Sequence, residues 1–237
     1  MAPRPPLRAI FFDAGNTLIR IDYAAIATAL AARGVSRTPD ELMRAEWRAR
    51  VRLDADVLAT GEVASTEART THSRYLQLVL EGIGVTEPDL VAAMDEWRRG
   101  HNQPLGLWTA PEPDAAPALM LAREAGLRTG VISNSNGTIR QILARLSLMS
   151  LVDFALDSHE EGVEKPRREI FERALARAGV GASEAAYVGD LYSIDVLGAR
   201  RAGLEAVLLD PGLCWGSRDC PTAPTVLDAV KRLLACT

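Results

Sequence analysis

The sequence predicts an α/β protein that has a Rossmann-like core with a mostly parallel sheet and an inserted all-helical cap domain. After Pro104, short apolar runs alternate with stretches whose apolar residues recur three and four positions apart, a pattern typical of βα units. Residues 21–103 show only the helical spacing, so they are expected to form an insertion without strands. We therefore predict a core domain over residues 1–20 and 104–237 and a cap domain over residues 21–103.

The first strand is predicted over residues 8–13, and it ends at Asp13. The apolar run Ala9–Phe12 stops at this carboxylate, and the small, turn-forming residues Ala14–Thr17 follow it. This places Asp13 at the carboxyl edge of the sheet, where open α/β proteins bind their ligands. A poorly solvated carboxylate there serves a cation or a reaction, unless Asp13 only caps its own backbone in an Asx-turn.

Four helices are predicted in the insertion, over residues 23–33, 39–57, 65–81 and 87–100. Thr38 precedes the second helix and Glu41 follows three residues later, which is the pattern of a capping box. Beyond Pro104, strands are predicted over residues 128–133, 152–156, 184–189 and 206–210, and helices over residues 112–125, 138–147, 167–178, 193–202 and 225–234. Repeated βα units imply parallel strands with helices on both faces.

Composition narrows the possible partners of this chain of 237 residues. Its net charge is -4 without long basic runs, which disfavours nucleic acid. Residues 1–6 lack the apolar segment of a signal peptide, and no run approaches the roughly 18 apolar residues of a membrane span, so no membrane partner is expected. The cysteines Cys214, Cys220 and Cys236 lack zinc-site spacing and favour a reduced, cytoplasmic protein, with pairing of the first two left open. A monomer and a homodimer are both compatible with the sequence.

Polar side chains stand where several predicted strands end. Asp13, Ser133 and Asp190 each follow an apolar run, and the ends of parallel strands share one edge, so these side chains can converge. Asp13 and Asp190 together suit Mg²⁺, which takes one or two carboxylates and phosphate oxygens. Ser133 and Asn134 can donate to phosphoryl oxygens, and Lys165 can neutralise the transition state. The chemistry predicted is phosphoryl or related transfer to a carboxylate nucleophile.

Each of these residues also has a purely structural interpretation. Ser133 and Asn136 are good caps for the helix that follows them. Lys165 and Pro166 can form an exposed loop in which the proline starts a helix. Asp190 can cap the helix beyond it. Taken together, these interpretations require unrelated coincidences at successive strand ends, so the functional interpretation is preferred.

In this order the residues resemble the haloacid dehalogenase-like (HAD) hydrolase superfamily, in the subgroup with a helical cap inserted after the first strand. The resemblance covers nearly the whole chain, and its four motifs match Asp13–Leu18, Val131–Asn134, Lys165–Pro166 and Val188–Asp195. The resemblance implies that Asp13 is the nucleophile, that Lys165 bridges Asp13 and the substrate, and that Asp195 is a supporting acid. It implies that Thr17 steadies the loop, that Ser133 binds the transferring group, and that Asn16 and Asn134 lie at the substrate. It also implies that Mg²⁺ is held by Asp13, the Gly15 carbonyl and Asp190.

The chain departs from this family at Gly15. Phosphatases of the superfamily carry an aspartate at this position, which protonates the leaving oxygen and later activates water. The glycine carbonyl can still contact Mg²⁺, but no acid remains, and such a group is worth about 10²–10⁴ in rate, or roughly 3–5.5 kcal/mol of barrier. Tyr192, Asp22 and His72 are candidate substitutes.

Three functions are compatible with this departure. The first is a Mg²⁺-dependent phosphatase acting on a small phosphorylated metabolite. The second is a 2-haloacid dehalogenase-type hydrolase without metal. This function is favoured by the missing acid and the pair Trp47–Arg48. It is disfavoured by the Gly189–Asp190 motif, by Phe171 and by the lack of an aromatic residue at position 15. The third is a weakly active or inactive member that acts as a binding or regulatory protein. A phosphonate hydrolase is excluded because residues 21–103 contain no lysine. Selectivity is expected to reside in cap residues that face Asp13.

Overall fold

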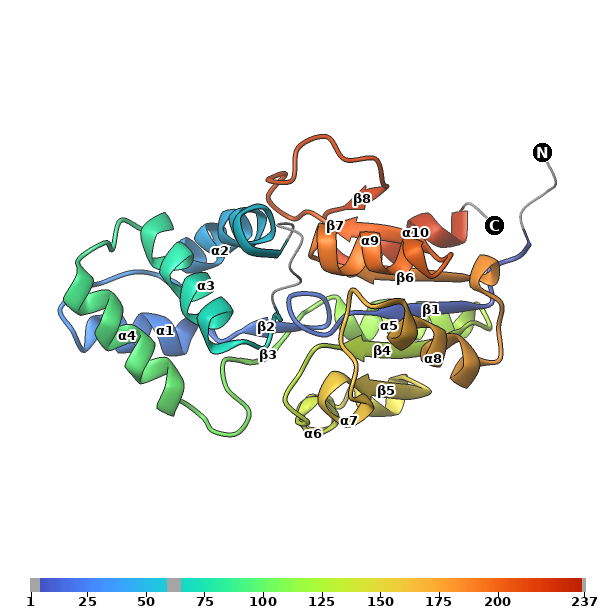
Figure 1. Cartoon of the computed structure of the whole chain (residues 1–237), viewed down its shortest axis with the longest axis horizontal. Coiled ribbons are helices and arrows are strands. Elements are labelled where there is room, and N and C mark those ends of the chain that lie inside the picture. Colours follow the sequence, from blue (N-terminus) through green and yellow to red (C-terminus); the bar gives the residue numbers. More distant parts are fainter. Residues whose placement is uncertain (1–4, 59–64, 236–237) are drawn as a thin grey trace.

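Six parallel strands form the sheet of the larger lobe in this computed structural model, which describes residues 5–58 and 65–235 (Figure 1). The strands are β1 (Ala9–Phe12), β4 (Arg128–Ser133), β5 (Phe154–Asp157), β6 (Ala185–Gly189), β7 (Glu205–Leu209) and β8 (Thr222–Ala223). They lie in the order β5-β4-β1-β6-β7-β8, and all their pairings are parallel. This is the Rossmann order, whose switch point lies between β1 and β6. The predicted α/β fold class is confirmed.

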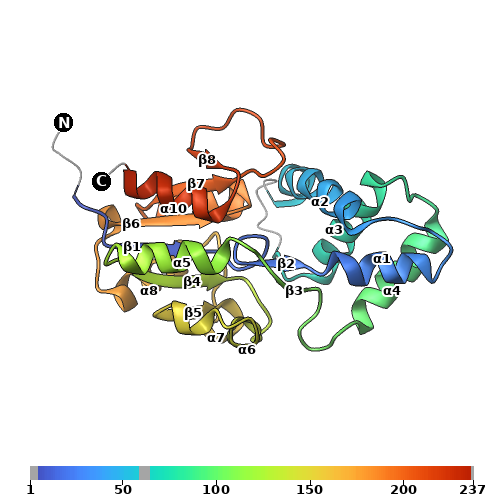
Figure 2. The ribbon, with the colours of Figure 1, turned by 180° about the vertical axis from the view of Figure 1, so that it is seen from behind.

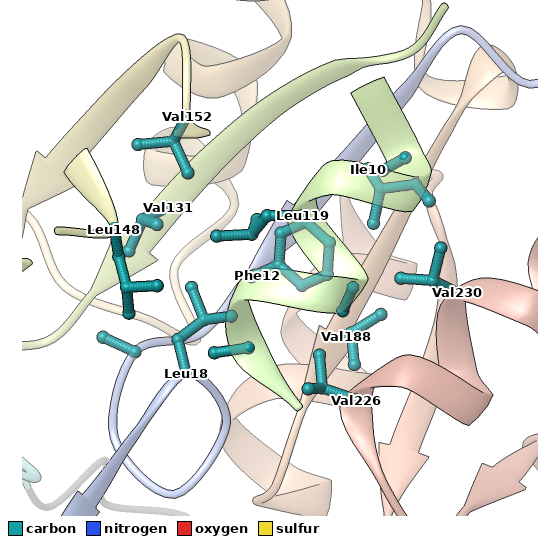
Figure 3. Close-up of a cluster of buried hydrophobic side chains, with 14 of the residues drawn as sticks. Ile10, Phe12, Leu18, Leu119, Val131, Leu148, Val152, Val188, Val226 and Val230 are labelled. Atoms are coloured by element: carbon teal, nitrogen blue, oxygen red, sulfur yellow. The ribbon is translucent and has the colours of Figure 1, made fainter. Parts of the chain in front are cut away.

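Helices cover both faces of the sheet because side chains of β1 alternate between two cores. Ile10 and Phe12 pack with the first core (Figure 3). Helices α5 (Ala115–Glu124) and α10 (Val226–Ala235) cover this face of the sheet (Figure 2). Ala9 and Phe11 pack with the second core, under α8 (Arg168–Ala178) and α9 (Leu197–Arg201), which lie on the opposite face in Figure 1. All four residues of β1 are fully buried. The strand that precedes Asp13 is therefore held on both sides.

The smaller lobe consists of helices with a hydrophobic core of their own. The helices are α1 (Tyr23–Ala31), α2 (Pro39–Leu53), α3 (Arg69–Gly82) and α4 (Pro88–Gly100), with a π-helical turn, η1 (Asp54–Leu58), after α2. Ile26, Leu30, Leu42 and Met94 are buried in this core. Thr38 and Glu41 form the predicted capping box at the start of α2. The four helices predicted between residues 21 and 103 are thus present, apart from the residues 59–64 that the structure does not describe.

An antiparallel pair of short strands joins the two lobes, and the sequence analysis did not predict it. The strands are β2 (Ile19–Ile21) and β3 (Trp108–Pro111). Strands of three and four residues are too short for an alternating pattern to be recognised, and β8, with two residues, was missed for the same reason. The pair lies at the two places where the boundary between core and cap was predicted, and those boundaries stay a prediction.

The remaining elements of the described chain are short. They are α6 (Ile139–Arg145), η2 (Met149–Leu151), α7 (Ser158–Glu161), η3 (Ala182–Glu184) and the π-helical turn η4 (Tyr192–Val196). Among residues 5–58 and 65–235, no helix combines the length and the apolar character that crossing a membrane requires. Cys214 and Cys220 are free thiols, and Cys236 lies outside the described residues.

Candidate active site

Three of the predicted site residues lie together at the carboxyl edge of the sheet. Asp13 follows β1, and its backbone N–H donates to the carbonyl of Val188 in β6 at 2.9 Å. Ser133 is the last residue of β4 and Asp190 follows β6, the two strands that flank β1. All three side chains are buried and line one cavity of about 250 Å³. The expected convergence at the Rossmann switch point is therefore observed.

Lys165 connects the nucleophile candidate to the rest of the edge. Its Nζ donates to Asp13 Oδ1 at 2.5 Å, to Asp195 Oδ1 at 2.8 Å and to the Tyr187 hydroxyl at 2.9 Å. An ammonium group has three donors, so every one of them is used. Asn134 fixes the loop, because its Oδ1 accepts from Lys165 N at 2.8 Å and its Nδ2 donates to Lys165 O at 3.0 Å. Lys165 is therefore buried, and the interpretation that it belongs to an exposed loop is wrong.

Asp195 supports the loop after β6, and both of its carboxylate oxygens accept hydrogen bonds. Its Oδ2 accepts from the backbone N–H groups of Asp190 at 3.1 Å and Leu191 at 2.9 Å, while its Oδ1 accepts from Lys165. A Cβ at Gly189 would lie 2.4 Å from Asp195 Cγ, so only glycine allows this close approach. Asp195 thus holds the backbone of Asp190 and the Lys165 ammonium, and the supporting role expected for it stays a prediction.

A buried cluster from the cap, which the sequence analysis missed, reaches Asp190. Arg50 NH1 lies 3.2 Å from Asp190 Oδ2, and both side chains are 4% exposed. The Arg50 guanidinium also forms two hydrogen bonds with Glu46, one of them at 2.8 Å between Nε and Oε1. The hydroxyls of Tyr23, at 3.0 Å, and of Tyr75 donate to the same Glu46 carboxylate. We call Glu46, Arg50, Tyr23 and Tyr75 the cap cluster.

The periodicity of α2 carried a signal for the cap cluster. The apolar positions of this helix, Leu42, Ala45, Ala49 and Leu53, are buried and recur three and four residues apart. Glu46 and Arg50 occupy the same face, four residues apart, which is the spacing of an ion pair. Charged residues on an apolar helix face require buried partners. The pattern could have identified the pair, but not the carboxylate that it meets.

The loop between β1 and β2 holds the remaining residues of the first motif. The carbonyl of Ala14 accepts the backbone N–H groups of Thr17, Leu18 and Ile19 at 2.9–3.3 Å. Asn16 has a φ of 53°, which asparagine tolerates, and its Nδ2 donates to Asp190 Oδ2 at 3.3 Å. Thr17 is fully buried, lies outside the cavity of Asp13, and its hydroxyl has no partner among the described residues. The expected steadying of this loop by Thr17 stays a prediction.

Burial and mutual repulsion raise the pKa values of Asp13 and Asp190. Burial raises the pKa of Asp13 to about 6, although the Lys165 ammonium opposes this shift. Burial also raises the pKa of Asp190 well above its usual range, against the pull of Arg50. Burial disfavours the charge on Lys165, but the carboxylates of Asp13 and Asp195 outweigh it and raise its pKa. Asp13 and Asp190 are therefore the acids whose charged forms a bound cation would stabilise most.

The donor set fits a hard divalent cation. Asp13, Asp190 and Asp195 each offer an oxygen within 4.8 Å of the other two. The ion pair of Asp13 uses Oδ1 and the contacts of Asp190 use Oδ2, so the second oxygen of each carboxylate makes no ion pair among the described residues. Together with Glu46 there are four buried carboxylates against two cations, Lys165 and Arg50, a formal excess of two negative charges. Such a site suits Mg²⁺ bound through one or two carboxylates.

Of the three candidate substitutes for the missing acid, one lines the cavity. His72 lies there, with its Nε2 3.8 Å from Glu67 Oε1. Asp22 is engaged as the cap of α1, accepting from Ala25 N at 2.9 Å. The Tyr192 hydroxyl donates to Asp219 at 2.6 Å on the surface. Arg48, considered for halide binding, is exposed.

Comparisons with known proteins agree with this geometry. Residues 7–203 match a family model described as "Hydrolase: haloacid dehalogenase-like hydrolase". The chain is 31% identical to a glyceraldehyde 3-phosphate phosphatase of Methanothermobacter thermautotrophicus over 90% of each chain. It is 34% identical to a ribulose-1,5-bisphosphate 5-phosphatase of Halopiger xanaduensis, over 86% of this chain and 84% of the other. Among solved structures, a 2-haloacid dehalogenase from Pseudomonas syringae is similar, with a TM-score of 0.56, 26% identity and coverage of 97% and 98%.

Proposed function

Because the chain belongs to the haloacid dehalogenase-like hydrolase family, we propose that it is a Mg²⁺-dependent phosphatase that acts on a small phosphorylated metabolite through Asp13. One observation carries the proposal: the acids at the sheet edge exceed the cations by two charges, and Asp13 and Asp190 each keep an oxygen for a divalent ion. The two relatives described above, both named as phosphatases, support it.

In the first step, a carboxylate oxygen of Asp13 attacks the phosphorus of the substrate. A bond forms between that oxygen and phosphorus, and the bond from phosphorus to the ester oxygen breaks with its electron pair going to the leaving oxygen. Lys165 holds the Asp13 carboxylate in place and balances negative charge as the phosphoryl group transfers. In the second step, water attacks the aspartyl-phosphate, which releases inorganic phosphate and restores Asp13.

The remaining residues of the edge bind and orient. Ser133, Asn134 and Asn16 line the cavity, and the Ser133 hydroxyl can donate to the phosphoryl oxygens. Both amide N–H donors of Asn134 and of Asn16 are engaged by groups of the protein, so these two side chains shape the site instead of donating to the substrate as the sequence predicted. Mg²⁺, held by Asp13, the Gly15 carbonyl and Asp190, would supply positive charge to the phosphoryl oxygens. Asp195 orients Asp190 through the backbone of the loop after β6. Gly15 has no acidic group that could donate the proton that the leaving oxygen takes up.

Turnover of p-nitrophenyl phosphate tests the proposal. We expect hydrolysis with Mg²⁺, none with EDTA, and recovery when Mg²⁺ is restored in excess. Asp13→Asn should be inactive under all three conditions. Activity that is equal in EDTA, or no activity of the wild-type protein with Mg²⁺, would contradict the proposal.

A 2-haloacid dehalogenase is the second candidate, and its support is the 26% identical solved structure together with the missing acid. In that reaction Asp13 would attack carbon, and halide would leave without a proton. The buried Asp190 disfavours it, because Arg50 is shared with Glu46 and does not bring the pKa of Asp190 back to its usual range, so a further cation is needed beside Asp13. Release of chloride from 2-chloropropionate in EDTA would support the dehalogenase, and its absence beside phosphatase activity would exclude it.

A weakly active or inactive chain that binds a partner is the third candidate. The glycine at position 15 favours it, because removal of the general acid slows the reaction. A screen of phosphorylated metabolites with Mg²⁺ separates this candidate from an active phosphatase. Phosphate release above that of Asp13→Asn for at least one metabolite excludes it.

We also propose that the protein works in the cytoplasm as a monomer or homodimer, without a nucleic-acid or membrane partner. The free thiols of Cys214 and Cys220 support a reducing compartment. The net charge of -4 disfavours binding to nucleic acid. Light scattering of the purified protein distinguishes the two oligomeric states.

A further inference from the structure

We propose that the substrates are aryl phosphates, in which a phenol-type leaving group packs on Trp108 and departs without being protonated. This rests on the proposed phosphatase function and specifies its substrate class. Two features of the cavity carry it: the side chain that occupies the place of the missing acid, and the side chains that line the cavity beyond that place.

The place of the missing acid is taken by an indole. A Cβ at Gly15 would have Trp108 Cδ1 at 3.2 Å and Trp108 Nε1 at 3.3 Å, and the third nearest atom, at 4.0 Å, is also from Trp108. The His72 ring lies farther out, with its centroid 6.1 Å from that of Trp108. The group that meets position 15 is therefore an indole with no acidic proton to give.

Without an acid, the leaving oxygen must depart as an anion. A phenolic oxygen has a pKa of about 10, whereas an alkyl alcohol is close to water, at about 15.7. A phenolate is therefore the far better unassisted leaving group. An enzyme that has lost the acid but kept nucleophile, lysine and metal acids is suited to esters of this kind.

The space beyond the phosphate site is aromatic and apolar. Trp108 stacks on Tyr75, with ring centroids 5.8 Å apart and planes at 12°. Both rings line the cavity of Asp13, together with the aliphatic side chains of Ile139 and Ile142. Trp108 also packs against the cores of both lobes, so its ring is fixed. A flat ring of a ligand can extend such a stack.

Several polar side chains of the cavity wall are already engaged within the protein. Arg98 donates to Asp95 at 2.8 Å, and Thr71 donates to the Ser65 carbonyl at 2.8 Å. Thr66 accepts from Asn134 at 2.9 Å. These three side chains are less available to the hydroxyls of a sugar, and most of the exposed wall is apolar. The lining favours an aromatic leaving group over a polyol.

The test compares kcat/KM for phenyl phosphate, glyceraldehyde 3-phosphate and acetyl phosphate, each with Mg²⁺. Phenyl phosphate should exceed glyceraldehyde 3-phosphate by about 10²–10⁴-fold, which is the contribution of a general acid. Acetyl phosphate also needs no acid but has no ring, so it reports the phosphate site alone. Comparable rates for the phenyl and triose esters would overturn the proposal.

Variants separate stacking from leaving-group chemistry. Trp108→Leu should lower the ratio of phenyl to acetyl phosphate kcat/KM about 10-fold, and Trp108→Phe should largely preserve it. Loss of folded enzyme cancels in this ratio, because both substrates are assayed on one preparation. Trp97→Leu changes a tryptophan that lies beside His101, away from this cavity, and should leave the ratio unchanged. An unchanged ratio in Trp108→Leu would overturn the role of the indole.

The outcomes also separate this proposal from the proposed function. If acetyl phosphate is hydrolysed with Mg²⁺ and Asp13 but phenyl phosphate is not favoured, the phosphatase stands and the substrate class is wrong. If none of the three esters is hydrolysed, both are wrong.

Discussion

Two buried clusters of charge meet at Asp190, and they differ in composition and origin. The core cluster, Asp13, Lys165, Asp190 and Asp195, lies at the strand ends and carries two more negative than positive charges. The cap cluster contains one carboxylate, Glu46, and one guanidinium, Arg50, so it is neutral. The core cluster has residual charge for a ligand, whereas every Glu46 oxygen is engaged by donors of the protein. This difference supports the proposal that the core cluster performs the chemistry, and we propose that the cap cluster positions Asp190 through Arg50.

Removal of the nucleophile tests the core cluster with the largest expected effect. Asp13→Asn keeps the shape of the side chain but cannot form the acyl phosphate, so kcat for p-nitrophenyl phosphate should fall by about 10⁴–10⁶-fold. Steady-state kinetics with Mg²⁺ measures this. Asp40→Asn, an exposed acid in the first turn of α2, is the matched control and should retain activity. A loss below 10-fold at Asp13 would mean that another residue is the nucleophile.

Restoring the acid tests the interpretation of Gly15. Gly15→Asp should raise kcat for alkyl phosphates, and the gain should approach about 10²-fold when Trp108→Leu makes room for the new side chain. The single variant should gain less, because its Cβ meets the indole at 3.2 Å. The gain is measured by comparing kcat for glyceraldehyde 3-phosphate between Trp108→Leu and the double variant. If the double variant binds Mg²⁺ normally and gains nothing, the missing acid does not limit the rate.

Breaking the ion pair tests the positioning role of the cap cluster. Arg50→Met should reduce the free energy of unfolding by about 3–5 kcal/mol, because Glu46 and Asp190 are left buried without their cation. Denaturant unfolding measures the loss, and Arg48→Met, on the exposed face of the same helix, should change stability by less than about 0.5 kcal/mol. Adding Glu46→Gln to Arg50→Met should recover part of the stability. No recovery would show that the two charges are not coupled.

A single hydrogen bond of the cap cluster gives the smallest effect. Tyr23→Phe removes the 3.0 Å bond to Glu46 and should cost about 1.5–3 kcal/mol, since the acceptor is charged and buried. Tyr192→Phe removes a hydroxyl bonded to Asp219 at the surface and should cost less than about 1 kcal/mol. Equal losses in the two variants would argue against a special contribution from burial at Glu46.

The core cluster was predictable from sequence, and the cap cluster was not. The ends of parallel strands share an edge, so Asp13, Ser133 and Asp190 could be placed together from strand order alone. Lys165 was singled out for its positive charge, whereas its bridge to Asp13 and the role of Asp195 followed from the resemblance to a family. Helical periodicity put Glu46 and Arg50 on one face of α2, but it does not say where a helix docks. Trp108 lies on a strand that is too short to recognise from the sequence, so its position beside Gly15 could not be predicted.

Trapping the covalent intermediate tests the central claim most directly. Borohydride reduces an acyl phosphate to an alcohol, so Asp13 in phosphorylated enzyme becomes homoserine, which peptide mass spectrometry locates. We predict this conversion at Asp13 when the protein is incubated with p-nitrophenyl phosphate and Mg²⁺, and none when EDTA replaces Mg²⁺. Turnover without conversion at Asp13, or equal conversion in EDTA, would contradict the account.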